Sequence, residues 1–200
     1  ICGKAHTNAE GGKGSSEIGG AVYGGNDDAD NSGTLQYIRL EYTGFAFDEE
    51  HEANGISFYG VGNGTIVDHC EAYKGSDDGF EFFGGSVNVS NMVVVSCSDD
   101  SFDWTEGWNG KGTDLVAYQE AKATLGYDCD CLIEADNNEN DNAATPVSHP
   151  VLKNLILAGN GESKQGIRLR RGTQADIDNA KVCGKGQPLV VESALTNASL

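Results

Sequence analysis

The feature that most constrains this chain is a short internal repeat. Asn54-Gly55-Ile56-Ser57-Phe58-Tyr59-Gly60 returns as Asp78-Gly79-Phe80-Glu81-Phe82-Phe83-Gly84, and then as Asp100-Ser101-Phe102-Asp103-Trp104-Thr105-Glu106. These copies lie 24 and 22 residues apart, and shorter copies follow at 133–136, 166–170 and 188–192. One such unit cannot bury its apolar side chains alone. The units must therefore stack and share a continuous interior.

A second series of β-prone runs alternates with the first. Its members are Leu35–Gly44, Ile66–Gly75, Val89–Cys97, Leu115–Gln119, Leu152–Ala158 and Ile177–Gly184. Two strands per 22–24 residues, with no helical periodicity between them, predict an all-β fold, a right-handed parallel β-helix. Leucine-rich repeats need regularly placed leucines, and β-propeller blades need about 40–45 residues, so both alternatives fit the spacing less well.

Strand alternation assigns the faces of the first series. Ile56, Phe80, Phe102, Ile133 and Ile167 are predicted to form one interior column, and Ser57, Glu81, Asp103, Glu134 and Arg168 an outer one. Glu134 follows Asp103 by 31 residues, which is longer than one coil, so we expect an insertion. We predict a single domain over 1–200 with a loop insertion at 120–150. The opening Ile-Cys-Gly-Lys reads as a strand in progress, which suggests a fragment lacking upstream coils.

The net charge limits the classes of binding partner that the protein can have. The formal net charge is −18, from 31 acidic and 13 basic residues, which disfavours nucleic acid and anionic membranes. No apolar stretch approaches the ~18 residues of a membrane span. Cations, and calcium above all, suit such a surface, although the charge alone would also keep the protein soluble. The six cysteines, an even number, favour an oxidising compartment and disulfides, with the pairing left open.

Acidic residues recur at the turns and on the outer column. Asp77, Asp78, Glu81, Asp99, Asp100 and Asp103 are the predicted metal ligands, with calcium as the expected cofactor. The alternative is that the turn aspartates only accept hydrogen bonds from the backbone.

Two further interpretations concern glycans. Tyr59 and Phe83 are expected to be exposed as a sugar platform, with Glu134, Arg168 and Arg170 as further contacts; the alternatives are a covering loop and simple charge balance. As an enzyme, the chain would use Glu81 and Asp103, one strand spacing of ~4.8 Å apart, as the carboxyl pair of a hydrolase. Arg168 would then hold a uronate or act as a lyase base. No complete catalytic set is recognisable.

Several segments resemble a known family. They are Gly33-Thr34-Leu35-Gln36-Tyr37-Ile38-Arg39-Leu40-Glu41-Tyr42, Asp77-Asp78-Gly79-Phe80-Glu81-Phe82-Phe83-Gly84-Gly85, Asp99-Asp100-Ser101-Phe102-Asp103-Trp104 and Arg168-Leu169-Arg170-Arg171-Gly172-Thr173. They are similar to large bacterial surface β-helix proteins with a pectate-lyase-like fold, common in Bacteroidetes-type and marine bacteria, many with a type IX secretion sorting tail. The resemblance covers about residues 18 to 192 and implies fold and location more than activity. The Gly-His-Gly and Arg-Ile-Lys elements of polygalacturonases are absent.

Together these features predict an extracellular or cell-surface module with a structural or adhesive role. Its expected partner is a glycan or another cell-surface component, with calcium in support, and the repeat leaves self-assembly open. The alternative is a polysaccharide lyase or glycoside hydrolase acting on acidic glycans.

Overall fold

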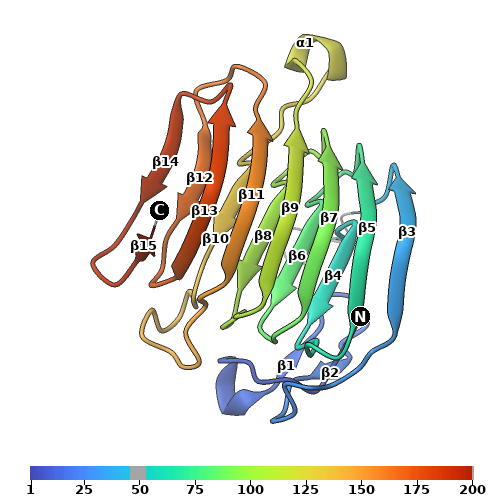
Figure 1. The fold of residues 1–200 in the computed structure, drawn as a ribbon, viewed down its shortest axis with the longest axis vertical. Coiled ribbons are helices and arrows are strands. Elements are labelled where there is room, and N and C mark those ends of the chain that lie inside the picture. The colour runs from blue at the N-terminus through green and yellow to red at the C-terminus, as the bar shows by residue number, and fades with distance from the viewer. Residues whose placement is uncertain (46–52, 200) are drawn as a thin grey trace.

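A computed structural model describes residues 1–45 and 53–199. The chain winds into a stack of coils, each contributing one strand to each of two large parallel sheets (Figure 1). The six-stranded sheet holds β4 (Ile56–Tyr59), β6 (Phe80–Phe83), β8 (Phe102–Thr105), β10 (Ile133–Ala135), β12 (Gln165–Leu169) and β14 (Gln187–Val191). The seven-stranded sheet holds β3 (Thr34–Glu41), β5 (Ile66–Tyr73), β7 (Asn88–Val95), β9 (Lys111–Tyr118), β11 (Val151–Ala158), β13 (Gln174–Cys183) and β15 (Asn197–Ser199).

The predicted register of the first strand series is confirmed. Ile56 pairs with Phe80, Phe80 with Phe102, Phe102 with Ile133, and Ile133 with Ile167. Aromatic rings strengthen this interior: Phe58 stacks on Phe82 with ring centroids 5.0 Å apart, and Phe82 stacks on Trp108 at 4.1 Å. The fold is therefore a parallel β-helix whose apolar side chains lie between the two sheets.

Most strands of the seven-stranded sheet contain a bend that the repeat did not predict. One residue in each of six strands has a left-handed backbone, with φ between 52° and 60°: Tyr37, His69, Asn91, Asp114, Asn154 and Asn179. Non-glycine residues rarely adopt this conformation, and Asn and Asp tolerate it best. The bend turns each strand into two halves that face different directions, and it places the six side chains in one column along the stack.

The N-terminal segment corrects the prediction of an exposed aromatic platform. Residues 1–5 run beside β4, with the Gly3 amide donating to the Tyr59 carbonyl at 2.8 Å. The segment continues through a 3-10 turn at Glu10–Gly12 into the antiparallel pair β1 (Gly14–Ser15) and β2 (Val22–Tyr23). The ring of Tyr23 packs on Tyr59 at 5.1 Å, and Tyr59 stacks on Phe83 at 4.4 Å. Tyr59 and Phe83 are therefore only 6% and 8% exposed, because this segment covers them.

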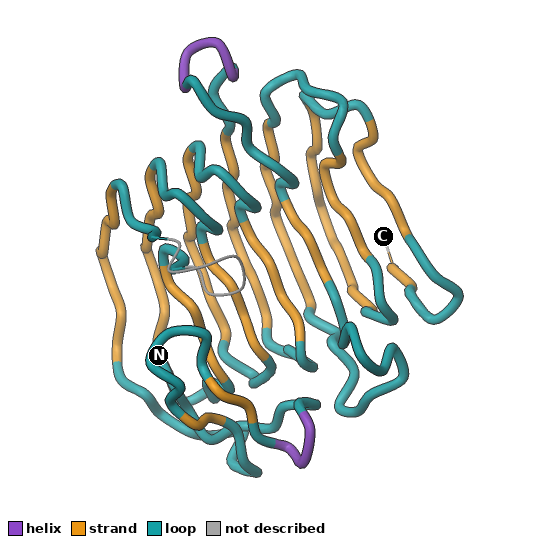
Figure 2. The backbone as a smooth tube through the Cα atoms, turned by 180° about the vertical axis from the view of Figure 1, so that it is seen from behind, coloured by secondary structure: helices purple, strands orange, loops and turns teal. Residues whose placement is uncertain are grey.

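The stretch 120–150 contains β10 with loops on both sides, and α1 (Lys122–Leu125) stands clear of the stack (Figures 1 and 2). No helix among the described residues is long and apolar enough to cross a membrane. All six cysteines are free thiols; Cys2 and Cys183 are exposed and the other four are buried. The predicted disulfides are therefore not present in this structure.

Candidate functional site

A groove of about 310 Å³ opens on the outer face of the six-stranded sheet. Strands β6 and β8 place Glu81 and Asp103 in it, and their pairing register sets these two residues side by side. Glu17 comes from the N-terminal segment, and Glu139 from the loop after β10. The remaining lining residues are Phe83, Thr105, Glu106, Asp136, Asn138, Asn140, Arg170 and Arg171. Six of the twelve lining residues are thus carboxylates, and two are arginines.

The turn before β6 shows what two of the predicted ligands do. Asp78 Oδ1 accepts a hydrogen bond from the Asp100 amide at 2.8 Å, and Asp100 Oδ1 accepts one from the Cys131 amide at 2.5 Å. Each aspartate therefore bonds to the same turn one coil further along, which is the backbone role considered as the alternative to metal binding. These bonds use one oxygen of each carboxylate.

The predicted metal ligands separate into groups. Oxygens of Asp78, Glu81 and Asp103 lie within 4.8 Å of one another, and so do those of Asp77, Asp78 and Asp99. Asp100 instead lies with Glu134 and the Cys131 thiol. Two members of the first group, Glu81 and Asp103, also line the groove. This first group is therefore the one best placed to meet a ligand from solvent.

The carboxyl groups beside the groove resist ionisation. Burial, followed by repulsion from neighbouring carboxylates, raises the pKa of Asp78, Glu81 and Asp103 well above the usual values. Within residues 1–45 and 53–199, neither Glu81 nor Asp103 forms an ion pair with a basic side chain. A bound cation would lower the free energy of their charged forms.

Asn54 contacts this group through its side-chain nitrogen. It is 8% exposed, and its Nδ2 donates to Ser57 Oγ at 2.9 Å and to Glu81 Oε2 at 2.6 Å. Its Oδ1 is buried with no hydrogen-bond partner among the described residues. Calcium accepts carboxylate and amide oxygens in flexible geometry. Asp78, Glu81 and Asp103 are therefore the residues that fit a calcium ion.

The arginines of the predicted glycan site are engaged in ion pairs. Arg168 contacts Glu134 and Glu192, each at 3.0 Å, and Arg170 contacts Glu134 and, at 2.7 Å, Asp136. The hydrogen bond to Glu192 is the main cause of a raised pKa for Arg168, and its guanidinium therefore keeps its proton. Arg168 is thus unsuited to act as a base. Of the predicted glycan contacts, Arg170 and the mostly buried Phe83 line the groove.

Residues that the repeat could not reveal anchor the N-terminal segment beside the groove. The Tyr23 hydroxyl donates to Glu106 Oε2 at 2.6 Å, and Thr7 Oγ1 donates to the same oxygen at 3.1 Å. Burial raises the pKa of Glu106. Glu17 belongs to no motif of the sequence, and only the fold brings it to the groove. Glu106, by contrast, is the last residue of a copy of the repeat and could have been assigned from it.

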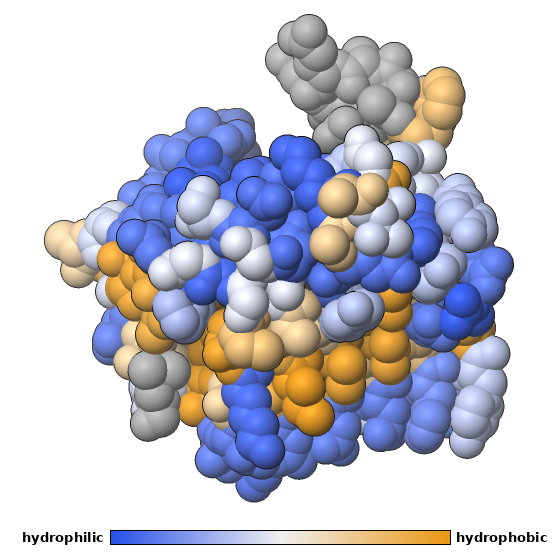
Figure 3. Space-filling view, turned by 90° about the horizontal axis from the view of Figure 1, so that it is seen from above, coloured by the Kyte–Doolittle hydropathy of each residue, from blue (hydrophilic) through white to orange (hydrophobic). Residues whose placement is uncertain are grey.

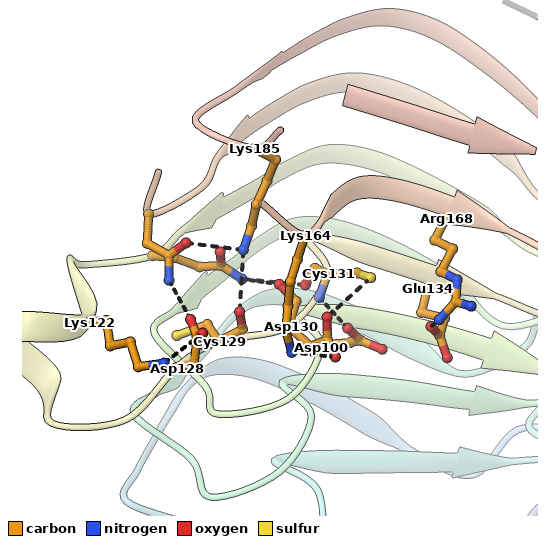
Figure 4. Close-up of polar contacts among 12 residues, drawn as sticks. Asp100, Lys122, Asp128, Cys129, Asp130, Cys131, Glu134, Lys164, Arg168 and Lys185 are labelled. Carbon is orange, nitrogen blue, oxygen red and sulfur yellow. Dashed lines mark hydrogen bonds and ion pairs between the residues drawn. The ribbon is translucent and has the colours of Figure 1, made fainter. Parts of the chain in front are cut away.

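A second polar cluster holds the α1 loop against the next coils (Figure 4). Lys164 pairs with Asp130 at 2.9 Å, and Lys185 Nζ donates to the Cys129 carbonyl at 3.3 Å. Burial lowers the pKa of the Lys185 amine. The thiol of Cys131 is also buried, and burial with nearby carboxylates raises its pKa, so it stays protonated. This cluster therefore has a structural role.

Stacked parallel coils with a carboxylate-lined groove on one outer face define a right-handed parallel β-helix. The chain belongs to the pectate-lyase-like β-helix domain family, whose model matches residues 1–200. No curated protein and no solved structure matches the chain.

Proposed function

We propose that the protein is an extracellular or cell-surface β-helix module with a structural or adhesive role, which contacts an acidic glycan through a calcium ion in the groove. The observation that carries the proposal is the group of Asp78, Glu81 and Asp103, whose oxygens converge within 4.8 Å at an open groove. Pectate-lyase-like β-helix domains are typically extracellular or surface proteins, which supports the location.

The groove suits a bridging ion better than direct binding of an anion. Its carboxylates would repel a uronate, whereas calcium takes six to eight oxygens and the protein group supplies only part of that set. Water and the hydroxyl or carboxylate oxygens of a glycan would complete it. Arg170 and Arg171 also line the groove, and their ion pairs with Asp136 offset part of its negative charge.

The test is calcium-dependent binding of oligogalacturonate, measured by isothermal titration calorimetry. We expect binding in calcium, loss of binding in excess chelator, and at least tenfold weaker binding for Glu81→Gln and Asp103→Asn. Asp178→Asn, which removes an exposed carboxylate of the other sheet, is the matched control and should bind as wild type.

Two results would overturn the proposal. Equal binding with and without calcium would exclude the bridging ion. Release of unsaturated sugars by the wild-type protein would show a lyase rather than an adhesive module.

A further inference from the structure

We propose a second binding surface on the outer face of the seven-stranded sheet, which takes a linear neutral polysaccharide lying along the stack. The surface centres on a groove of about 170 Å³ beside the column of bend residues. Its lining residues are Asp114, Val116, Asn154, Leu155, Ile156, Asn179 and Lys181, and we call it the bend groove. It shares no residue with the carboxylate groove, so each proposal can be tested independently of the other.

The polar side of the bend groove is a ladder with unused hydrogen-bonding capacity. Asn154 Nδ2 donates to Asp114 Oδ1 at 2.9 Å, and Asn179 Nδ2 donates to Asn154 Oδ1 at 2.8 Å. Each amide has two donor hydrogens and an oxygen with two lone pairs, so these contacts leave part of each group available. Successive members lie one strand spacing apart, about 4.8 Å, which is similar to the length of one sugar unit in an extended β-linked chain.

The other side of the groove is apolar. Val116 and Ile156 pair across β9 and β11, and Val93 precedes them in the same outer column. The neighbouring outer column contains Tyr118, which is 50% exposed, next to Val95. In the view from above, hydrophobic residues form a band along the stack with hydrophilic residues on both sides (Figure 3). A contiguous exposed apolar surface with a polar border is typical of a binding site.

The charges favour an uncharged occupant. Asp114 and Lys181 balance each other in the bend groove. Further along the same sheet, Arg39 pairs with Glu41 and Glu71 at 2.5 and 2.6 Å, so it offers no free positive charge to an anionic ligand. A second copy of the chain is disfavoured by the net charge of −18 that both copies would carry. An apolar strip beside a row of amides matches a sugar chain, whose rings present C–H faces and whose edges present hydroxyls.

The test uses cellohexaose and xylohexaose as probes, in excess chelator, with binding followed by amide chemical shifts and calorimetry. We expect shifts in the second halves of β7, β9, β11 and β13. Tyr118→Ala and Asn154→Ala should each weaken binding about tenfold, since each removes about 1.4 kcal/mol of contact energy. Lys111→Ala, an exposed change on the first half of β9, is the matched control, and Asp103→Asn should also bind as wild type.

Three outcomes would overturn the inference. The first is that neither hexasaccharide binds at millimolar concentration. The second is that Tyr118→Ala and Asn154→Ala both leave binding unchanged. The third is that the protein self-associates in sedimentation and that these two variants abolish the self-association. The last would assign the surface to contacts between copies of this chain. Thermal melting of each folded variant separates lost binding from lost structure.

Discussion

Replacing Asp103 by asparagine should stabilise the protein when no calcium is present. Glu81 and Asp103 face each other on adjacent strands, and their charged forms repel across about one strand spacing of 4.8 Å. At an effective dielectric constant near 20, two unit charges at that distance repel by roughly 3 kcal/mol. Protonation relieves part of this cost, so the gain in the free energy of unfolding should be at most about 3 kcal/mol at neutral pH.

The pH dependence has a definite sign. The pKa of Asp103 is raised in the fold, so its contribution to stability is present below the unfolded value and is lost as pH rises through the folded value. The Asp103→Asn variant does not lose this stability as pH rises, because asparagine does not ionise. The difference between Asp103→Asn and wild type should therefore be smallest near pH 4 and should grow with rising pH.

Urea unfolding in chelator, from pH 4 to pH 8, measures this difference. With a urea dependence of about 2–3 kcal/mol per molar, the largest gain corresponds to a midpoint shift of about 1 M. In calcium, the wild type should become more stable than Asp103→Asn, because the ion binds the folded wild type and the variant lacks one ligand. Destabilisation of Asp103→Asn in chelator, or a difference that does not change with pH, would refute the reasoning. Asp178→Asn, at an exposed position, should show neither effect.

Three further predictions follow from packing and exposure. Phe80→Ala should lower the free energy of unfolding by about 3–5 kcal/mol in chemical denaturation, with Phe80→Leu milder; a loss below about 1 kcal/mol would contradict a core position. A maleimide should label two thiols, Cys2 and Cys183, in the native protein and six after unfolding, as read by intact mass; labelling of fewer than six in the unfolded, unreduced protein would indicate a disulfide. Tyr23→Ala should release the N-terminal segment to limited proteolysis and expose Tyr59, whereas Tyr23→Phe, which keeps the ring contact, should protect it better.

The coil, its strands and their register were determined by the sequence alone. Alternation with a period of two assigns Phe80 and Phe102 to the interior and Glu81 and Asp103 to the outside, and a one-residue slip would turn each apolar side chain outward. Because every coil repeats the pattern, neighbouring copies can pair only in the register that keeps apolar residues together. The acidic outer column followed from the same periodicity.

The surroundings of that column were decided only by the tertiary structure. Tyr59 and Phe83 look exposed by alternation, yet Tyr23 covers them, and no local pattern shows where a segment 36 residues earlier will pack. The bend residues were also hidden, because Tyr37 and His69 do not share the turn chemistry of Asn154. Local periodicity governs which face a side chain takes. What then covers that face depends on contacts between segments far apart in the chain, which the sequence pattern does not encode.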